Sequence, residues 1–193
     1  MKLIKNIGVL VLILSMPLMA ITAAEKGLEI AQANDKANAG FKTETNVTKM
    51  VLINAYGDKI ERRMTSKSME TKGDGDKSII EFLWPADVKG TRMLTYTHKE
   101  RNDDQWLFLP ALNRIKRISS NNQSGSFMGS EFAYEDISSE EIEKYTYKYL
   151  KEDTINERPV WVIERIPTNK KSGYSKQISY TDKQYKNPLK IEY

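Results

Sequence analysis

The stretch WLFLPALNRIKRISSNNQSGSFMGSEFAYEDI, from Trp106 to Ile137, decides how the rest of the chain is interpreted. It begins as an apolar run, passes through the basic residues Arg114, Lys116 and Arg117, and continues as a loop rich in Ser, Asn and Gly. That loop carries large apolar side chains, whose exposure to water costs about 25 cal/mol per Å². We therefore expect that the loop either folds back over the core or lines a place where an apolar partner sits.

Apolar and polar residues alternate along most of the chain after position 44, and this pattern predicts β-strands. The expected strands are 45–54, 59–69, 78–84, 91–98, 105–109, 113–118, 144–150, 159–166 and 174–181. One helix is expected at 26–39, ended by Gly40. Short turns such as Tyr56-Gly57-Asp58 separate the early strands, and Ser138 to Glu141 predicts a helix start or tight turn. We predict a mainly β fold of the α+β class, with one meandering antiparallel sheet that curls to protect its edges.

The N-terminus has the pattern of a secretory signal peptide, residues 1–24. Lys2 and Lys5 precede an apolar run, and small residues lead to Ala24, after which we expect cleavage. An uncleaved membrane anchor is the alternative, although the run is short for a span of about 20 residues. The sequence contains no Cys, so no disulfide or Cys-linked lipid is expected. The prediction is a periplasmic protein with a single domain over residues 25–193.

Charge excludes one class of partner. Without Lys2 and Lys5, 28 basic side chains stand against 26 acidic ones, mixed along the chain. A nucleic-acid binder needs a field of one sign, so no nucleic-acid partner is expected.

The last residues, Leu189 to Tyr193, alternate and end the sequence inside an expected strand. We expect the domain to be truncated here, with further strands missing. An edge strand at the true terminus is the alternative.

The sequence contains only weak candidates for catalytic or metal-binding motifs. His98 is the single histidine, and we expect it to be a surface residue at a turn, since no serine or cysteine partner is placed by the sequence. Asp74-Gly75-Asp76 predicts a hairpin turn, because Ile79 stands where a calcium loop needs Gly. The acidic residues near the loop have no spacing that specifies a hydrolase pair. We expect no catalytic residue, no metal, no cofactor and no enzymatic activity.

Aromatic and methionine side chains accumulate on the expected strands and on the loop, and such side chains suit apolar ligands of variable shape. An ordinary core is the alternative for each of them. Within Trp106-Leu107-Phe108-Leu109 only one pair can face inward, and we predict the aromatic pair. The predicted acyl-site residues are Phe82, Trp84, Met93, Tyr96, Trp106, Phe108, Phe127, Met128 and Phe132.

Three stretches carry a family resemblance. The stretch from Trp106 to Ile137 resembles the signature of exported outer-membrane lipoprotein-sorting proteins, a branch of the LolA-like superfamily. GLEIAQANDKANAGF at 27–41 and FLWPADVKGTRMLTY at 82–96 are similar to the same family. The resemblance implies an incomplete antiparallel β-barrel, with helices covering an apolar cavity for acyl chains, and a partner transporter of the resistance-nodulation-division type.

The sequence thus leads to a functional hypothesis. We expect a carrier that binds lipid or lipoprotein acyl chains, with Arg114, Lys116 and Arg117 meeting a head group or an acidic transporter surface. The alternative is a periplasmic interaction subunit of a transporter that has a filled core and binds no ligand.

Overall fold

The structure is a computed structural model that describes residues 20–193. Most of the predicted signal peptide, residues 1–24, therefore lies outside the described residues. The first element is helix α1, Ala23–Asn38, which confirms the predicted helix and begins three residues earlier. Thr22 is its N-cap, and Thr22 and Glu25 exchange capping hydrogen bonds. Cleavage after Ala24 would remove this cap.

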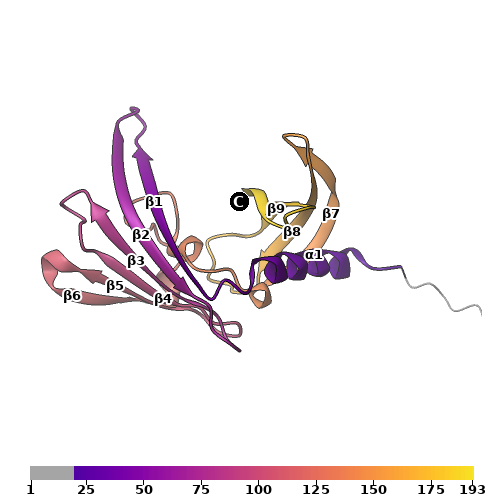
Figure 1. Ribbon diagram of the computed structural model, residues 1–193, viewed down its shortest axis with the longest axis horizontal. Helices are drawn as coiled ribbons and strands as arrows, with labels where there is room; N and C mark the ends of the chain where they lie inside the picture. The colour runs from indigo at the N-terminus through magenta and orange to yellow at the C-terminus, as the bar shows by residue number, and fades with distance from the viewer. Residues whose placement is uncertain (1–19) are drawn as a thin grey trace, which may run out of the picture.

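Ten strands form two antiparallel sheets (Figure 1). Strands β1 to β6 make a six-stranded meander in chain order, and β7 to β10 make a four-stranded meander. The first sheet comprises β1 Thr43–Ile53, β2 Lys59–Met69, β3 Lys77–Trp84, β4 Arg92–Tyr96, β5 Asp104–Leu109 and β6 Arg114–Ile118. The second comprises β7 Tyr145–Ile155, β8 Arg158–Pro167, β9 Gln177–Asp182 and β10 Pro188–Glu192. The prediction of a mainly β antiparallel fold is confirmed.

The prediction of one continuous meandering sheet was wrong, because β6 and β7 do not pair. The chain between them is too long for a hairpin and contains the short 3₁₀ turns η2 Ser120–Asn122, η3 Tyr134–Ile137 and η4 Ile142–Lys144. Seen from the side, the two sheets diverge from a common junction (Figure 1).

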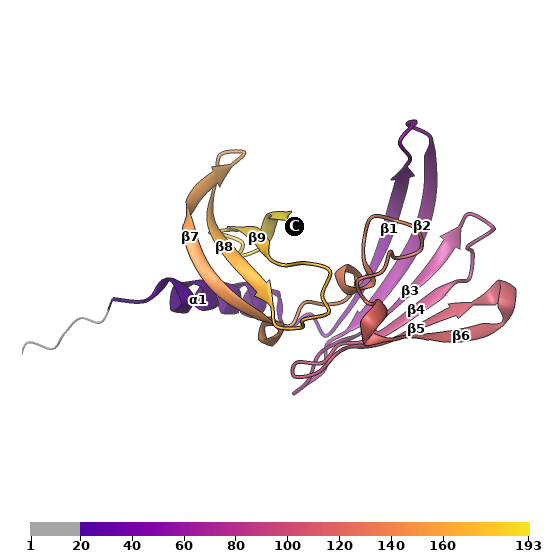
Figure 2. The ribbon, with the colours of Figure 1, turned by 180° about the vertical axis from the view of Figure 1, so that it is seen from behind.

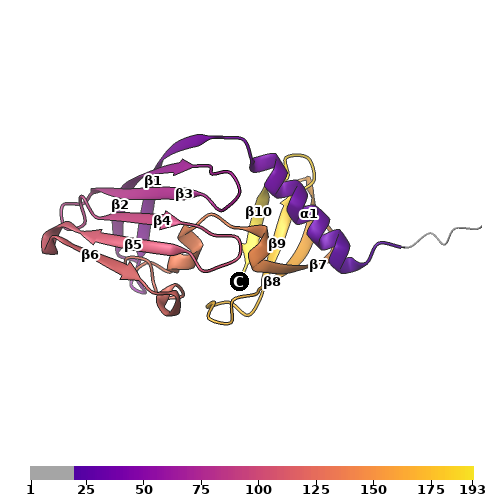
Figure 3. The same cartoon turned by 90° about the horizontal axis from the view of Figure 1, so that it is seen from below.

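Helix α1 lies across the four-stranded sheet (Figure 3). Its buried residues Gly27, Ile30 and Ala31 recur at helical spacing and face β7. A side chain at Gly27 would meet the backbone nitrogens of Lys148 and Tyr149 at 2.8 Å, so the helix approaches β7 as closely as the backbone permits. Helices were expected to cover the predicted cavity, but α1 covers the other sheet instead. No helix among residues 20–193 is long and apolar enough to cross a membrane.

Strand alternation divides the six-stranded sheet into two faces. The inner face is the one that carries the main apolar core, and the outer face is the opposite one. The core consists of Met64, Phe82, Val88, Met93, Leu107, Ile118 and Phe127. All but Val88 and Phe127 come from strands β2 to β6, and the pairings Met64 with Phe82 and Met93 with Leu107 place them on one face.

Candidate functional site

The inner face is covered by the irregular chain from Ser119 to Ile137, which we call the covering segment. It runs between the two sheets (Figure 2). Its Phe127 is 0% exposed, and the Phe127 ring lies 5.9 Å from the ring of Phe82 and 5.7 Å from that of Tyr134. Of the two alternatives for the apolar loop, the structure therefore has the first: the loop folds back over the core.

Backbone hydrogen bonds and one buried amide hold this shape. A tight turn at Met128 and Gly129, both at positive φ, brings Ser126 and Ala133 into a β-bridge. Gln105 of β5 is fully buried and donates hydrogen bonds to the carbonyl of Tyr134 (3.0 Å) and the hydroxyl of Ser138 (2.8 Å). The segment is thus attached to the sheet by both apolar and polar contacts.

The structure does not bring the predicted acyl-site residues together at one site. Phe82, Met93 and Phe127 are buried together in the core, and Met128 packs against it. Trp84 and Phe132 are half exposed, at 50% and 51%. The remaining three, Tyr96, Trp106 and Phe108, lie on the outer face.

The prediction that Trp106 and Phe108 face inward was wrong. Leu107 is 5% exposed and belongs to the core, while the two aromatics are only half-buried on the other face. The reason is the register, which places Leu107 beside Met93 under Phe127, whereas Trp106 lies beside Leu94.

The predicted basic cluster is also divided by strand alternation. Arg114 and Lys116 of β6 share a face with Leu109 and Leu107, whereas Arg117 lies opposite Trp106 on the outer face. All three side chains are exposed. Only Arg114 and Lys116 remain on the side of the covered core.

Arg62 was not predicted as a site residue, and its guanidinium joins β2 to the covering segment. Its Nη1 donates a hydrogen bond of 2.5 Å to the carbonyl of Met128, and the guanidinium lies 6.0 Å from the ring centroid of Phe82. Its Nε is buried without a partner, and no carboxylate pairs with this cation among residues 20–193. This hydrogen bond holds the cation beside the apolar face and closes the segment at its tip.

Two cavities lie at the junction of the sheets, and no residue of the main apolar core lines either of them. The larger, of about 830 Å³, lies between α1, the β2–β3 turn and the four-stranded sheet, and polar residues such as Asp35, Asp76 and Arg165 line it. The second, of about 570 Å³, is lined by residues that include Arg101, Asp103 and Asn169. Neither cavity is lined by a predicted acyl-site residue.

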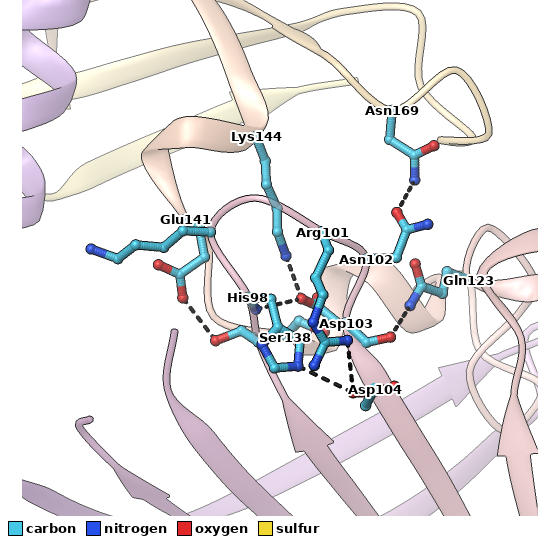
Figure 4. Close-up of polar contacts among 12 residues, drawn as sticks. His98, Arg101, Asn102, Asp103, Asp104, Gln123, Ser138, Glu141, Lys144 and Asn169 are labelled. Carbon is cyan, nitrogen blue, oxygen red and sulfur yellow. Dashed lines mark hydrogen bonds and ion pairs between the residues drawn. The ribbon is translucent and has the colours of Figure 1, made fainter. Parts of the chain in front are cut away.

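Polar contacts hold the junction together (Figure 4). From the four-stranded side, the ammonium of Lys144 pairs with Asp103, and Asn169 donates to Asn102 at 3.1 Å. Thr97 donates to the carboxylate of Glu141 at 2.7 Å. These residues come from the β4–β5 turn, from the chain around η4 and from the loop between β8 and β9, so the two sheets are joined through loops and not through a shared core.

His98 lies at the centre of this network. The prediction of a surface residue was wrong, because His98 is 9% exposed. Its Nδ1 lies 2.6 Å from a carboxylate oxygen of Asp74, and its Nε2 lies 3.2 Å from one of Asp104. Carboxylate oxygens only accept hydrogen bonds, so the arrangement is complete when both ring nitrogens carry a proton. Both nitrogens are occupied by carboxylates, which leaves neither free to activate a nucleophile.

The histidine and nearby cations change the acidity of these carboxyls. The hydrogen bond from His98, reinforced by the backbone N–H of Lys99, holds the pKa of Asp74 well below its usual range. For Asp104, burial acts to raise the pKa, but hydrogen bonds from Arg101, Arg117 and His98 outweigh it and lower the pKa. Asp74 lies in the turn between the paired strands β2 and β3, which confirms the predicted hairpin turn.

Comparisons with known proteins assign the family. A family profile described as an uncharacterized protein matches residues 74–193. A domain from Vibrio parahaemolyticus, named as an outer membrane lipoprotein-sorting protein, is 52% identical over 88% of this chain and 72% of its own, with a TM-score of 0.85. The chain belongs to this family of outer membrane lipoprotein-sorting proteins.

Two further structures agree with the lipoprotein-sorting fold. A DUF1329 family protein from Desulfovibrio piger is 28% identical over 90% of this chain and 74% of its own, with a TM-score of 0.81. A LolA superfamily protein from Nitrosomonas europaea is 20% identical over 90% of this chain and 71% of its own, with a TM-score of 0.64, and shows the same fold. No protein with a curated description matches the sequence.

Proposed function

We propose that this lipoprotein-sorting family member is a periplasmic carrier of lipid or lipoprotein acyl chains. The acyl chain would lie on the inner face, in the place that Phe127 occupies without cargo. The observation that carries the proposal is the cover itself: an irregular segment, and not a strand or helix, closes an apolar face through one inserted ring. The two diverging sheets would then be the walls of an incomplete barrel.

Free energies support such an exchange. Burying an acyl chain stabilises the complex by about 0.8 kcal/mol per methylene, so eight methylenes contribute about 6 kcal/mol. Returning the Phe127 side chain to water costs about 1.5–3 kcal/mol. A chain of ordinary length can therefore displace the ring. The residues proposed to contact it are Met64, Phe82, Met93 and Leu107, with Met128 at the rim.

The head group has candidate partners at the edge of the inner face. Arg114 and Lys116 are exposed there and could pair with a phosphate or carboxylate, or with an acidic surface of an RND-type transporter. The activity proposed is transfer without chemical turnover.

Arg62 provides the test of the cover. A hydrogen bond from a charged donor contributes about 1.5–3 kcal/mol, so Arg62→Met should make the open form about 10- to 100-fold more populated. Arg63→Met is the matched control, because Arg63 is the next residue and lies on the outer face beside Trp84. Titration with a fluorescent fatty acid should give tighter apparent binding for Arg62→Met only. Equal binding by the two variants would exclude this residue as the closing contact.

A second candidate is an interaction subunit of a transporter that binds no ligand. The complete burial of Phe82 and Phe127 favours it, since a filled face needs no cargo. Native mass spectrometry and lipid extraction of the exported protein distinguish the two. Co-purified lipid supports the carrier, whereas a lipid-free protein that takes up no fluorescent fatty acid supports the interaction subunit.

A further inference from the structure

The outer face of the six-stranded sheet carries a second apolar feature. The register aligns Lys67, Ile79, Leu94, Trp106 and Arg117 in one row across β2 to β6. Three apolar side chains thus lie between two cations. Ile79 is 37% exposed, and neither α1 nor the four-stranded sheet packs extensively on β1 to β6.

Aromatic rings on this face are in contact with cations. The rings of Tyr96 and Trp106 pack edge to face at 5.4 Å between centroids. The ammonium of Lys77 lies 4.7 Å from the Tyr96 ring, and the guanidinium of Arg117 lies 6.0 Å from that of Trp106. Trp and Tyr prefer the interface between membrane and water, and Lys and Arg beside them attract anionic head groups.

The outer face carries positive charge that its own ion pairs do not neutralise. By register, β2 to β6 place six basic residues here (Lys59, Arg63, Lys67, Lys77, Arg92, Arg117) and three acidic ones (Glu61, Glu81, Asp104). Each of the acidic residues already pairs with a cation. Lys59, Lys67 and Lys77 pair with no carboxylate among the described residues. The free charge is therefore positive, and a complementary partner is negative.

We propose that the outer face docks on an anionic phospholipid surface, with the row through Trp106 in the interface and the three free lysines on the head groups. A sheet face that combines an apolar row, two aromatic side chains of the kind enriched at membrane interfaces and unpaired cations fits a lipid surface in both polarity and charge. The docking is independent of cargo binding, since it uses the face opposite to the covered one.

The test is sedimentation of the exported protein with vesicles, of phosphatidylcholine alone or mixed equally with phosphatidylglycerol. We expect binding to the mixed vesicles only, and weaker binding at higher salt. The double variant Lys67→Glu/Lys77→Glu should bind at least about tenfold more weakly. The matched control is Lys170→Glu/Lys171→Glu, which changes net charge equally on an exposed loop beyond β8 and should bind as the wild type does.

Quenching by brominated lipid adds a second readout. In a Trp84→Phe/Trp161→Phe background, Trp106 is the one tryptophan left in the sequence, and its fluorescence should be quenched on mixed vesicles and not on vesicles of phosphatidylcholine alone. Absence of binding to the mixed vesicles refutes the proposal and leaves an acidic protein as the partner of this face. An equal loss in the two double variants also refutes it, because attraction would then depend on net charge alone.

Discussion

Truncating Phe127 tests whether the covering segment opens separately from the sheet. The ring is 0% exposed between Phe82 and Tyr134. Phe-to-Ala changes at buried sites lower stability by about 3–5 kcal/mol. Here the loss should appear in the free energy that keeps the covering segment closed. The opening equilibrium of residues 119–137 should rise at least a hundredfold, since each 1.4 kcal/mol is a factor of ten.

Hydrogen exchange followed by mass spectrometry measures this directly. In Phe127→Ala, peptides from the covering segment should exchange much faster, while peptides from β3 to β5 should keep most of their protection. Phe132→Ala is the control, because Phe132 belongs to the same segment but is 51% exposed and should change exchange little. If β3 to β5 lose protection in step with the segment, the segment is part of one cooperative core and the reasoning fails.

Two further predictions concern the junction and the helix. The pKa of Asp74 is lowered by His98, so this carboxylate stabilises the fold above about pH 4, the unfolded value, and the contribution is lost as the pH falls below it. Asp74→Asn should therefore be less stable than the wild type in urea at pH 7, and the difference should shrink toward pH 2; a constant difference would contradict the assignment. Gly27→Ala should lower stability by about 1–3 kcal/mol, because its Cβ would meet the backbone of Lys148 and Tyr149. An unchanged melting temperature would show that α1 does not hold this close contact.

Alternation predicted most of the strands, because their polar residues occupy the phase that faces water. It failed to assign the faces of β5, where Trp106 to Leu109 are all apolar and alternation alone does not choose a side. The choice is made by distant residues, since Met93 and Phe127 complete a core with Leu107. Gln105 is buried on the same face as Leu107, whereas a polar residue in a strand usually marks the face exposed to water. Its position therefore pointed to the wrong face.

Local sequence patterns also could not predict the break between the sheets or the hydrogen bonds of His98. The connection from Ile118 to Tyr145 was long enough to suggest unpaired strands, but its apolar residues could equally have bound a partner. His98 receives its carboxylates from Asp74, 24 residues earlier, and from Asp104, six residues later. Such pairings come from sheet register, which no single stretch contains.

The central claim is that an acyl chain replaces Phe127 on the inner face. Fluorine NMR of protein labelled with 4-fluorophenylalanine tests it, because the chain has five Phe residues and each resonance can be assigned by a Phe-to-Leu change. Titration with a long-chain fatty acid should shift the resonances of Phe127 and Phe82 and leave those of Phe41 and Phe108 unchanged. Saturation without any change at Phe127 and Phe82 would contradict the account.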